Sequence, residues 1–221
     1  MQTMTHRERV LNTLHRRPVD QLPRGDTLWG ETYERYRREG HLGKDENAVE
    51  HFDLSWHQAG WINGIADLDF PVKTLEETEE TILRLDGNGA RLRYWKNRSG
   101  TPEHVGFGVE DREGWERQIK PHLLTVDRRR FDLAAYRQTR ATAAAQNRAF
   151  FWNGVAPFEQ MHPVCGHEGM LMGMALDPDW VGDMVMTYAE FTIRHLEVLF
   201  AEGGEPDAVW FYEDGRMTDF F

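Results

Sequence analysis

The chain has 221 residues, of which 40% are hydrophobic and 29% charged, and these values are typical of a globular domain rather than a disordered segment. Its 26 basic and 37 acidic residues give a formal net charge of −11, which argues against the basic face that nucleic-acid binding requires. The single cysteine, Cys165, excludes an intrachain disulfide framework and fits a reducing compartment. No apolar segment has the length of a signal peptide or membrane helix, so we expect a cytoplasmic protein without a membrane partner.

The first part of the chain, residues 1–60, is predicted to be mainly helical. Thr5 and Glu8 have the spacing of a capping box, in which each side chain satisfies a free backbone N–H at the start of a helix. Gly40 is a suitable helix end, because glycine readily adopts the left-handed conformation. The predicted elements are a helix at 5–15, a short strand at 21–25, a helix at 29–39, and a short helix and loop within 44–60.

The middle of the chain contains a β-hairpin signal. Asp86-Gly87-Asn88-Gly89 is a strong turn sequence, and apolar residues alternate with polar ones on both sides of it, so we predict a hairpin at 80–96. Before the hairpin, 74–77 is a second capping-box candidate. After it we expect a polar loop at 96–104 and a short helix at 111–123.

The second half alternates helices with apolar strands. Residues 149–155 form a continuous apolar run, as in parallel strands that are buried on both faces, and 207–212 form another. An Ala-rich helix is predicted at 133–148, and a long helix begins at Asp177-Pro178 and ends at Gly203-Gly204. This alternation predicts βα units over 149–214 around a parallel sheet.

Five segments, kept in order along the chain, resemble the uroporphyrinogen decarboxylase-like superfamily, which also contains the corrinoid-linked methyltransferases. The segments are 5–11 with 18–20, 74–90, Gly-Thr-Pro-Glu-His at 100–104, Gly-Val-Ala-Pro-Phe-Glu at 154–159, and 207–214. The resemblance implies an α/β fold of the (β/α)8 TIM-barrel family, with the active site at the C-terminal ends of the strands, formed by one domain over 1–221.

A closed barrel needs about 250 residues, whereas this sequence leaves room for roughly five barrel strands. We therefore expect an incomplete barrel with N-terminal helices and an inserted hairpin. An open parallel sheet exposes an apolar edge, which favours a fragment, a complementary C-terminal half or a homo-oligomer.

The resemblance implies decarboxylation of a tetrapyrrole or pyrrole carboxylate, a small-molecule substrate, without a cofactor. Two alternatives stay open: corrinoid-dependent methyl transfer with a corrinoid protein as partner, and a non-catalytic half of a split protein. The decarboxylases hold their polycarboxylate substrate with an R-x-x-x-R arginine pair, and Trp29 and Tyr33 stand at those positions here. The zinc ligands of the methyltransferases, a His-x-Cys motif and a later Cys, belong to a C-terminal half that this sequence lacks, so we carry over no metal site.

The candidate site residues combine the resemblance with positions at strand ends. Asp67 lies between apolar residues and is a candidate for the family aspartate that stabilises positive charge on the pyrrole. Glu159, Glu213 and Asp214 follow apolar strands, where carboxylates face a barrel mouth. The predicted catalytic residues are Asp67, Glu159 and Asp214, and the predicted substrate-binding residues are Trp29, Tyr33, Asn153, His162 and Glu213. The alternative roles are solvated loop acids, a helix-capping partner for Glu159, and simple helix packing for the two aromatic residues.

Two further motifs receive structural interpretations. His162, Cys165 and His167 have zinc-ligand chemistry, but Pro163 and Gly166 interrupt any regular helical face. We therefore predict a loop at the barrel rim and no metal. The basic run 128–130 is interpreted as a solvated segment before a helix.

Overall fold

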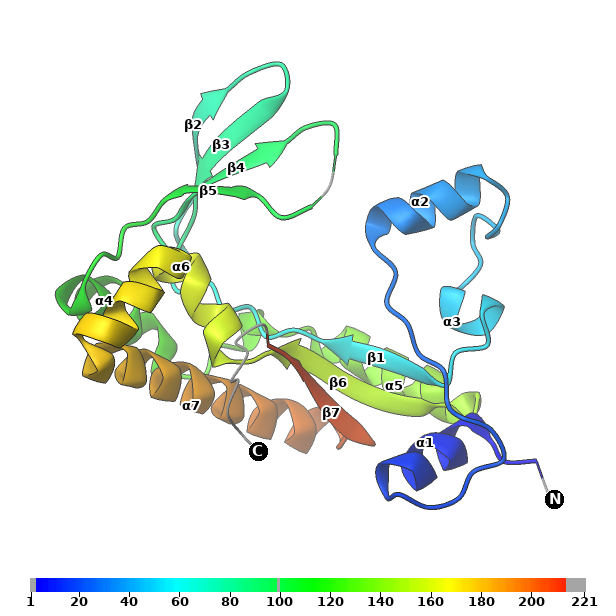
Figure 1. Cartoon of the computed structure of the whole chain (residues 1–221). Coiled ribbons are helices and arrows are strands. Elements are labelled where there is room, and N and C mark those ends of the chain that lie inside the picture. The colour runs from blue at the N-terminus through cyan, green and yellow to red at the C-terminus, as the bar shows by residue number, and fades with distance from the viewer. Residues whose placement is uncertain (1–2, 99, 214–221) are drawn as a thin grey trace. The chain divides into compact units, whose positions relative to one another are not determined.

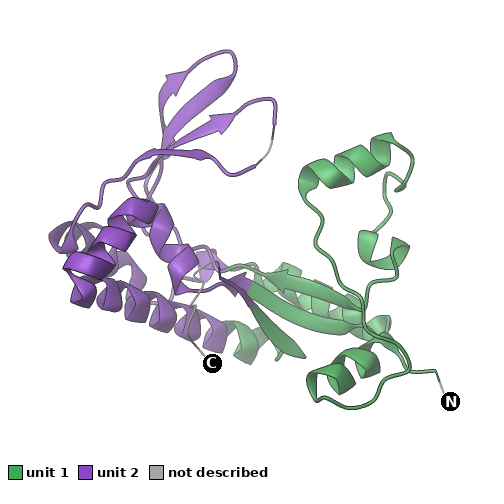
Figure 2. Ribbon diagram, viewed as in Figure 1, with its two compact units in different colours: residues 1–61, 132–153, 199–210 green, residues 62–131, 154–198, 211–221 purple. Residues whose placement is uncertain are grey.

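The computed structural model describes residues 3–98 and 100–213, and the chain divides into two compact units (Figure 2). Unit 1 contains residues 1–61, 132–153 and 199–210, and unit 2 contains residues 62–131, 154–198 and 211–221. No helix in the described part of the chain has the length and apolar character needed to cross a membrane.

The helices at the start of unit 1 follow their capping signals. Helix α1 (His6–Leu14) begins with the predicted capping box: the Thr5 hydroxyl accepts a hydrogen bond from the Glu8 N–H, and the Glu8 carboxylate accepts one from the Thr5 N–H at 2.7 Å. Helix α2 (Gly30–Arg38) ends before Gly40, whose φ of 78° is the left-handed conformation expected there. Helix α3 (Ala48–His51) has only four residues.

A parallel sheet of strands β1 (Trp56–Gly60), β6 (Ala149–Val155) and β7 (Ala208–Tyr212) has the order β1-β6-β7 (Figure 1). β1 pairs with β6 in parallel, with Trp56 opposite Ala149 and Gly60 opposite Asn153. The Asp207 N–H donates to the Phe150 carbonyl and the Ala156 N–H to the Tyr212 carbonyl, so β6 and β7 also advance in the same direction. The predicted strands at 149–155 and 207–212 are confirmed as neighbours.

The described residues form a mixed α/β fold in which this three-stranded sheet does not close into a barrel. Strand β7 lies at one edge of the sheet. Its large apolar side chains are 38–51% exposed, and they are Val209, Trp210, Phe211 and Tyr212. A subunit or second half that covers this edge stays a prediction.

Two predictions for unit 1 are wrong. Residues 21–25 form no strand: the Arg24 carbonyl accepts a hydrogen bond from the Ser55 N–H, but the Arg24 N–H donates to the Ser55 hydroxyl and not to a strand backbone. Gly25 lies against the Trp56 ring, leaving no space for a side chain. The loop expected before residue 60 is in fact β1. Its sequence contains polar residues and glycine, so it lacks the continuous apolar run by which the other two strands of the sheet were predicted. Its parallel pairing with β6 defines it as a strand.

Helix α5 (Leu133–Ala145) packs against β1 in the core of unit 1. The Tyr136 ring meets the Phe150 ring edge-on, with 4.9 Å between centroids, and its hydroxyl donates to the Gly204 carbonyl at 2.7 Å. A side chain at Gly203 would come within 2.5 Å of the Tyr136 ring, so glycine is required for this close approach. The predicted glycine end of the long helix therefore also serves packing.

Unit 2 contains an antiparallel sheet with the order β2-β3-β4-β5 (Figure 1). The predicted hairpin is confirmed as β3 (Thr81–Leu85) and β4 (Arg91–Trp95), with the turn at Asp86-Gly87-Asn88-Gly89. It is flanked by β2 (Lys73–Glu77) and β5 (Glu103–Gly106). The capping box expected at 74–77 is therefore wrong, because the fully exposed β2 gains its backbone partners from β3.

Helices form the rest of unit 2. They are α4 (Arg112–Gln118), the 3-10 helices η1 (Lys120–Leu123) and η2 (Arg128–Arg130), α6 (Pro157–Leu176) and α7 (Pro178–Gly203), whose last turn belongs to unit 1. Asp177 caps α7 as predicted, since its carboxylate accepts from the Trp180 N–H at 3.2 Å. In the core, the fully buried Trp115 lies beside Tyr188, with 5.8 Å between ring centroids.

The interpretation of residues 128–130 as a solvated run is wrong for Arg130. This side chain is buried and donates to the carbonyls of Asn63, Ile65, Ala66 and His122. The guanidinium group has five N–H donors, and here it satisfies carbonyls of an irregular segment that has no strand partner. Arg130 thus fixes the loop that contains Asp67.

Candidate functional site

The first turns of α6 bring together two of the predicted site residues. Pro157 occupies the first turn of α6, directly after β6, and places Glu159 at its third position. The Glu159 carboxylate lies 3.0 Å from Nε2 of His162, one helical turn later. The side chains are only 11% and 16% exposed, so this is a largely buried carboxylate–imidazole pair. A carboxylate in this position accepts the Nε2–H and leaves Nδ1 with its lone pair.

A break in α6 brings His167 to the same place. In a regular helix, residues five apart point about 140° away from each other. Gly166 has φ 73° and ψ 165°, outside the helical region, and thereby turns the chain between the two histidines. The His162 and His167 rings stack, with 4.4 Å between centroids and an interplanar angle of 18°. Sequence spacing predicted an interrupted face, whereas the interruption is what aligns these rings.

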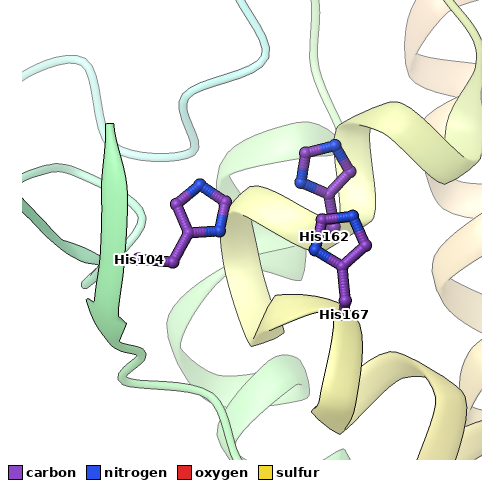
Figure 3. Close-up of side chains that lie close together, drawn as sticks. All are labelled: His104, His162 and His167. Carbon is purple, nitrogen blue, oxygen red and sulfur yellow. The ribbon is translucent and has the colours of Figure 1, made fainter. Parts of the chain in front are cut away.

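His104 completes the group from another element. It lies on β5 and points toward the two α6 histidines (Figure 3). Its ring centroid is 5.9 Å from that of His162 and 6.2 Å from that of His167. One ring nitrogen of each of the three residues lies within 4.8 Å of the other two. We call His104, His162 and His167 the histidine cluster; all three belong to unit 2.

Burial favours the neutral form of His104. It lowers the pKa of His104, and the neighbouring His162 and His167 lower it further because a second positive charge there is unfavourable. His104 is therefore neutral at neutral pH and offers a lone pair. Neutral imidazoles of this kind can accept protons or bind metals.

Cys165 does not take part in the cluster. Its Sγ is 3.7 Å from the Met161 carbonyl in the core, and burial raises the pKa of the thiol to about 11. A protonated buried thiol is neither a good nucleophile nor a good metal ligand. The rim loop expected around Cys165 is wrong, since this segment is part of α6.

Asp67 is placed in the loop of unit 2 that Arg130 holds. Its carboxylate accepts a hydrogen bond from the Asp69 N–H at 2.9 Å, and its N–H donates to the Gly87 carbonyl. These bonds make a local turn. Neither of these hydrogen bonds joins Asp67 to the histidine cluster, so a catalytic role for Asp67 stays a prediction.

Three predicted substrate-binding residues lie in unit 1. Tyr33 lines a cavity of about 340 Å³ together with residues of the 26–28 and 54–58 segments, whereas Trp29 is 69% exposed. Asn153 is buried at the end of β6. In the amide orientation that satisfies its neighbours, its Nδ2 donates to the Ala59 carbonyl and its Oδ1 accepts from Trp61 Nε1. This arrangement fixes the end of β1.

Of the two acidic residues predicted at the end of the last strand, the structure describes Glu213. Glu213 follows β7 and is exposed. Asp214 lies outside the described residues. Of the eight predicted site residues, the structure brings Glu159 and His162 together. His104 was not predicted as their neighbour, although it ends the Gly-Thr-Pro-Glu-His segment that contributes to the family resemblance.

Comparison with known proteins gives one similarity in structure. No family model matches the sequence, and no curated protein matches it. The fold is similar to that of a methyltransferase from Methanosarcina mazei, with a TM-score of 0.51 and 13% sequence identity over 91% of this chain. The chain spans 57% of the length of that methyltransferase. At this identity the similarity establishes a shared fold.

Proposed function

We propose that the chain is part of a methyltransferase and that it takes part in methyl transfer to or from a corrinoid protein. The observation that carries the proposal is the fold similarity to a methyltransferase over 91% of the chain. The resemblance of five sequence segments to a superfamily with a corrinoid-linked branch supports the same conclusion. No finding supports decarboxylation of a pyrrole carboxylate.

The chemistry of the candidate pocket residues also favours methyl transfer over porphyrinogen decarboxylation. A polycarboxylate substrate needs cationic side chains, and Trp29 and Tyr33 occupy the positions where the resemblance implies arginines. Methyl transfer instead needs a nucleophile kept free of its proton, a task for which a carboxylate–imidazole pair is suited. We assign that role to Glu159 and His162 in α6.

A methyl-transfer assay tests the proposal. The 221-residue protein is incubated with methylcob(III)alamin and a small thiol acceptor, and demethylation of the corrinoid is followed by its visible spectrum. We expect a rate above that of the protein-free mixture. Glu159→Gln should lower the rate by about 10²-fold or more, and the exposed Glu168→Gln of the same helix should not. A rate equal to the protein-free control, with the fold verified by circular dichroism, overturns the proposal, as does release of CO2 from a pyrrole carboxylate without methyl transfer.

A further inference from the structure

The histidine cluster brings together three side chains that could hold a metal ion. Three imidazole rings from β5 and from both sides of the α6 break present nitrogens within 4.8 Å of one another (Figure 3). Three nitrogens bound to one tetrahedral zinc ion at 2.0–2.1 Å lie roughly 3.3 Å apart. The nitrogens lie up to 4.8 Å apart in the structure, so zinc binding would draw the three rings closer together.

The His162 side chain has one ring nitrogen already fixed. Its Nε2 lies 3.0 Å from the Glu159 carboxylate, whereas its Nδ1 is buried and has no hydrogen-bond partner among the described residues. A buried polar atom without a partner costs free energy unless a ligand satisfies it. A carboxylate on the second nitrogen is the arrangement that orients metal-binding histidines and increases their basicity.

The donor set selects the class of metal. Three imidazoles with no thiolate suit Zn²⁺ and related borderline ions, whereas Mg²⁺ and Ca²⁺ prefer oxygen ligands and Cu⁺ prefers sulfur. Cys165 is excluded as a ligand because its thiol faces the Met161 carbonyl. Three protein ligands leave one tetrahedral position for water or another small molecule, as in catalytic zinc sites.

We propose that His104, His162 and His167 bind one zinc ion and that Glu159 orients His162 from the second coordination sphere. This assignment replaces the sequence interpretation, in which His162, Cys165 and His167 did not form a site. A histidine on β5, distant in sequence, takes the place of the cysteine. A His162 that binds zinc through Nδ1 and donates its Nε2–H to Glu159 has no lone pair left to accept a proton. In the zinc-bound protein the Glu159–His162 pair therefore positions the metal and does not act as a base. The proposal concerns metal binding by this unit and does not depend on methyl transfer.

Zinc titration of the tag-free 221-residue protein tests the proposal. After dialysis against a chelator, isothermal calorimetry with ZnCl2 should show one equivalent bound. Co²⁺ in its place should give the intense visible bands of a tetrahedral nitrogen site. His104→Ala, His162→Ala and His167→Ala should each weaken Zn²⁺ binding more than about 100-fold, and Glu159→Gln should weaken it about 10- to 100-fold.

His167→Ala is the decisive variant. The His167 side chain is exposed, so replacing it with alanine removes a zinc ligand and leaves the core intact. His122→Ala, at an exposed histidine of the same unit, is the matched control and should bind Zn²⁺ like the native chain. Thermal melting without metal verifies that each variant folds. Absence of stoichiometric binding, or equal Zn²⁺ affinity in the native and His167→Ala proteins, overturns the proposal and leaves the rings as packing.

Discussion

Gly166 sets the geometry of the histidine cluster, and its replacement by alanine should be strongly destabilising. Its backbone, at φ 73° and ψ 165°, lies in a region that is essentially restricted to glycine, and a non-glycine residue there costs about 1–3 kcal/mol. An added Cβ would also lie 2.4 Å from Cε2 and 2.9 Å from Cδ2 of Phe107. Such overpacking against a rigid ring costs a further 1–3 kcal/mol or so. We therefore expect Gly166→Ala to lower the free energy of unfolding by about 2–6 kcal/mol.

Urea unfolding followed by far-ultraviolet circular dichroism measures this change. Gly169→Ala is the control in the same helix, because its added Cβ would meet the Cys165 Cβ at an ordinary 3.6 Å. Alanine is favoured over glycine in a helix interior by about 1 kcal/mol, so this variant should be as stable as the native chain or more stable. A Gly166→Ala protein within about 0.5 kcal/mol of the native chain would refute the reasoning, since a change this small is typical of unconstrained surface positions.

Two other predictions concern unit 2. Arg130→Ala should lower the free energy of unfolding by about 3–5 kcal/mol, because it leaves partly or fully buried carbonyls without donors. Arg128→Ala removes an exposed charge and should change the free energy of unfolding by less than about 1 kcal/mol, and similar urea midpoints for the two variants would contradict the role of Arg130. Hydrogen bonds from Arg129 lower the pKa of Asp127 to about 2, so the ionised carboxylate stabilises the fold above pH 4, and this contribution is lost as the pH falls from 4 to 2. Thermal melting between pH 4 and pH 2 should show a smaller loss of stability for Asp127→Asn than for the native chain. The exposed Asp45→Asn is the control and should lose stability like the native chain. The same pH dependence of the melting temperature in all three proteins would exclude a contribution from Asp127.

Local signals predicted the regular elements of the chain well. The capping box at Thr5 and Glu8, the turn at Asp86–Gly89 and the Asp177 cap act over a few residues, and each is present in the structure. The apolar runs at β6 and β7 predicted neighbouring parallel strands, and the structure places them side by side. The physical reason, burial on both faces, holds for β6, whereas the side chains of β7 are partly exposed. Strands β1, β2 and β5 were missed, since an edge or exposed strand can have a polar sequence and depends on its neighbour for hydrogen bonds.

The candidate site depended on tertiary structure to a greater degree. The sequence by itself determined the local pair Glu159 and His162, because residues three apart meet on one helical face. The alignment of His167 with His162 depends on the non-helical backbone of Gly166, which no spacing rule predicts. The position of His104 beside them depends on the packing of unit 2, which brings β5 against the break in α6. The burial of Arg130 also depends on tertiary structure. Residues 128–130 are all arginines, so the sequence alone does not indicate which of them is buried against the carbonyls of another segment. Short-range hydrogen bonds are encoded locally, whereas contacts between distant segments exist only once the chain has closed the loops between them.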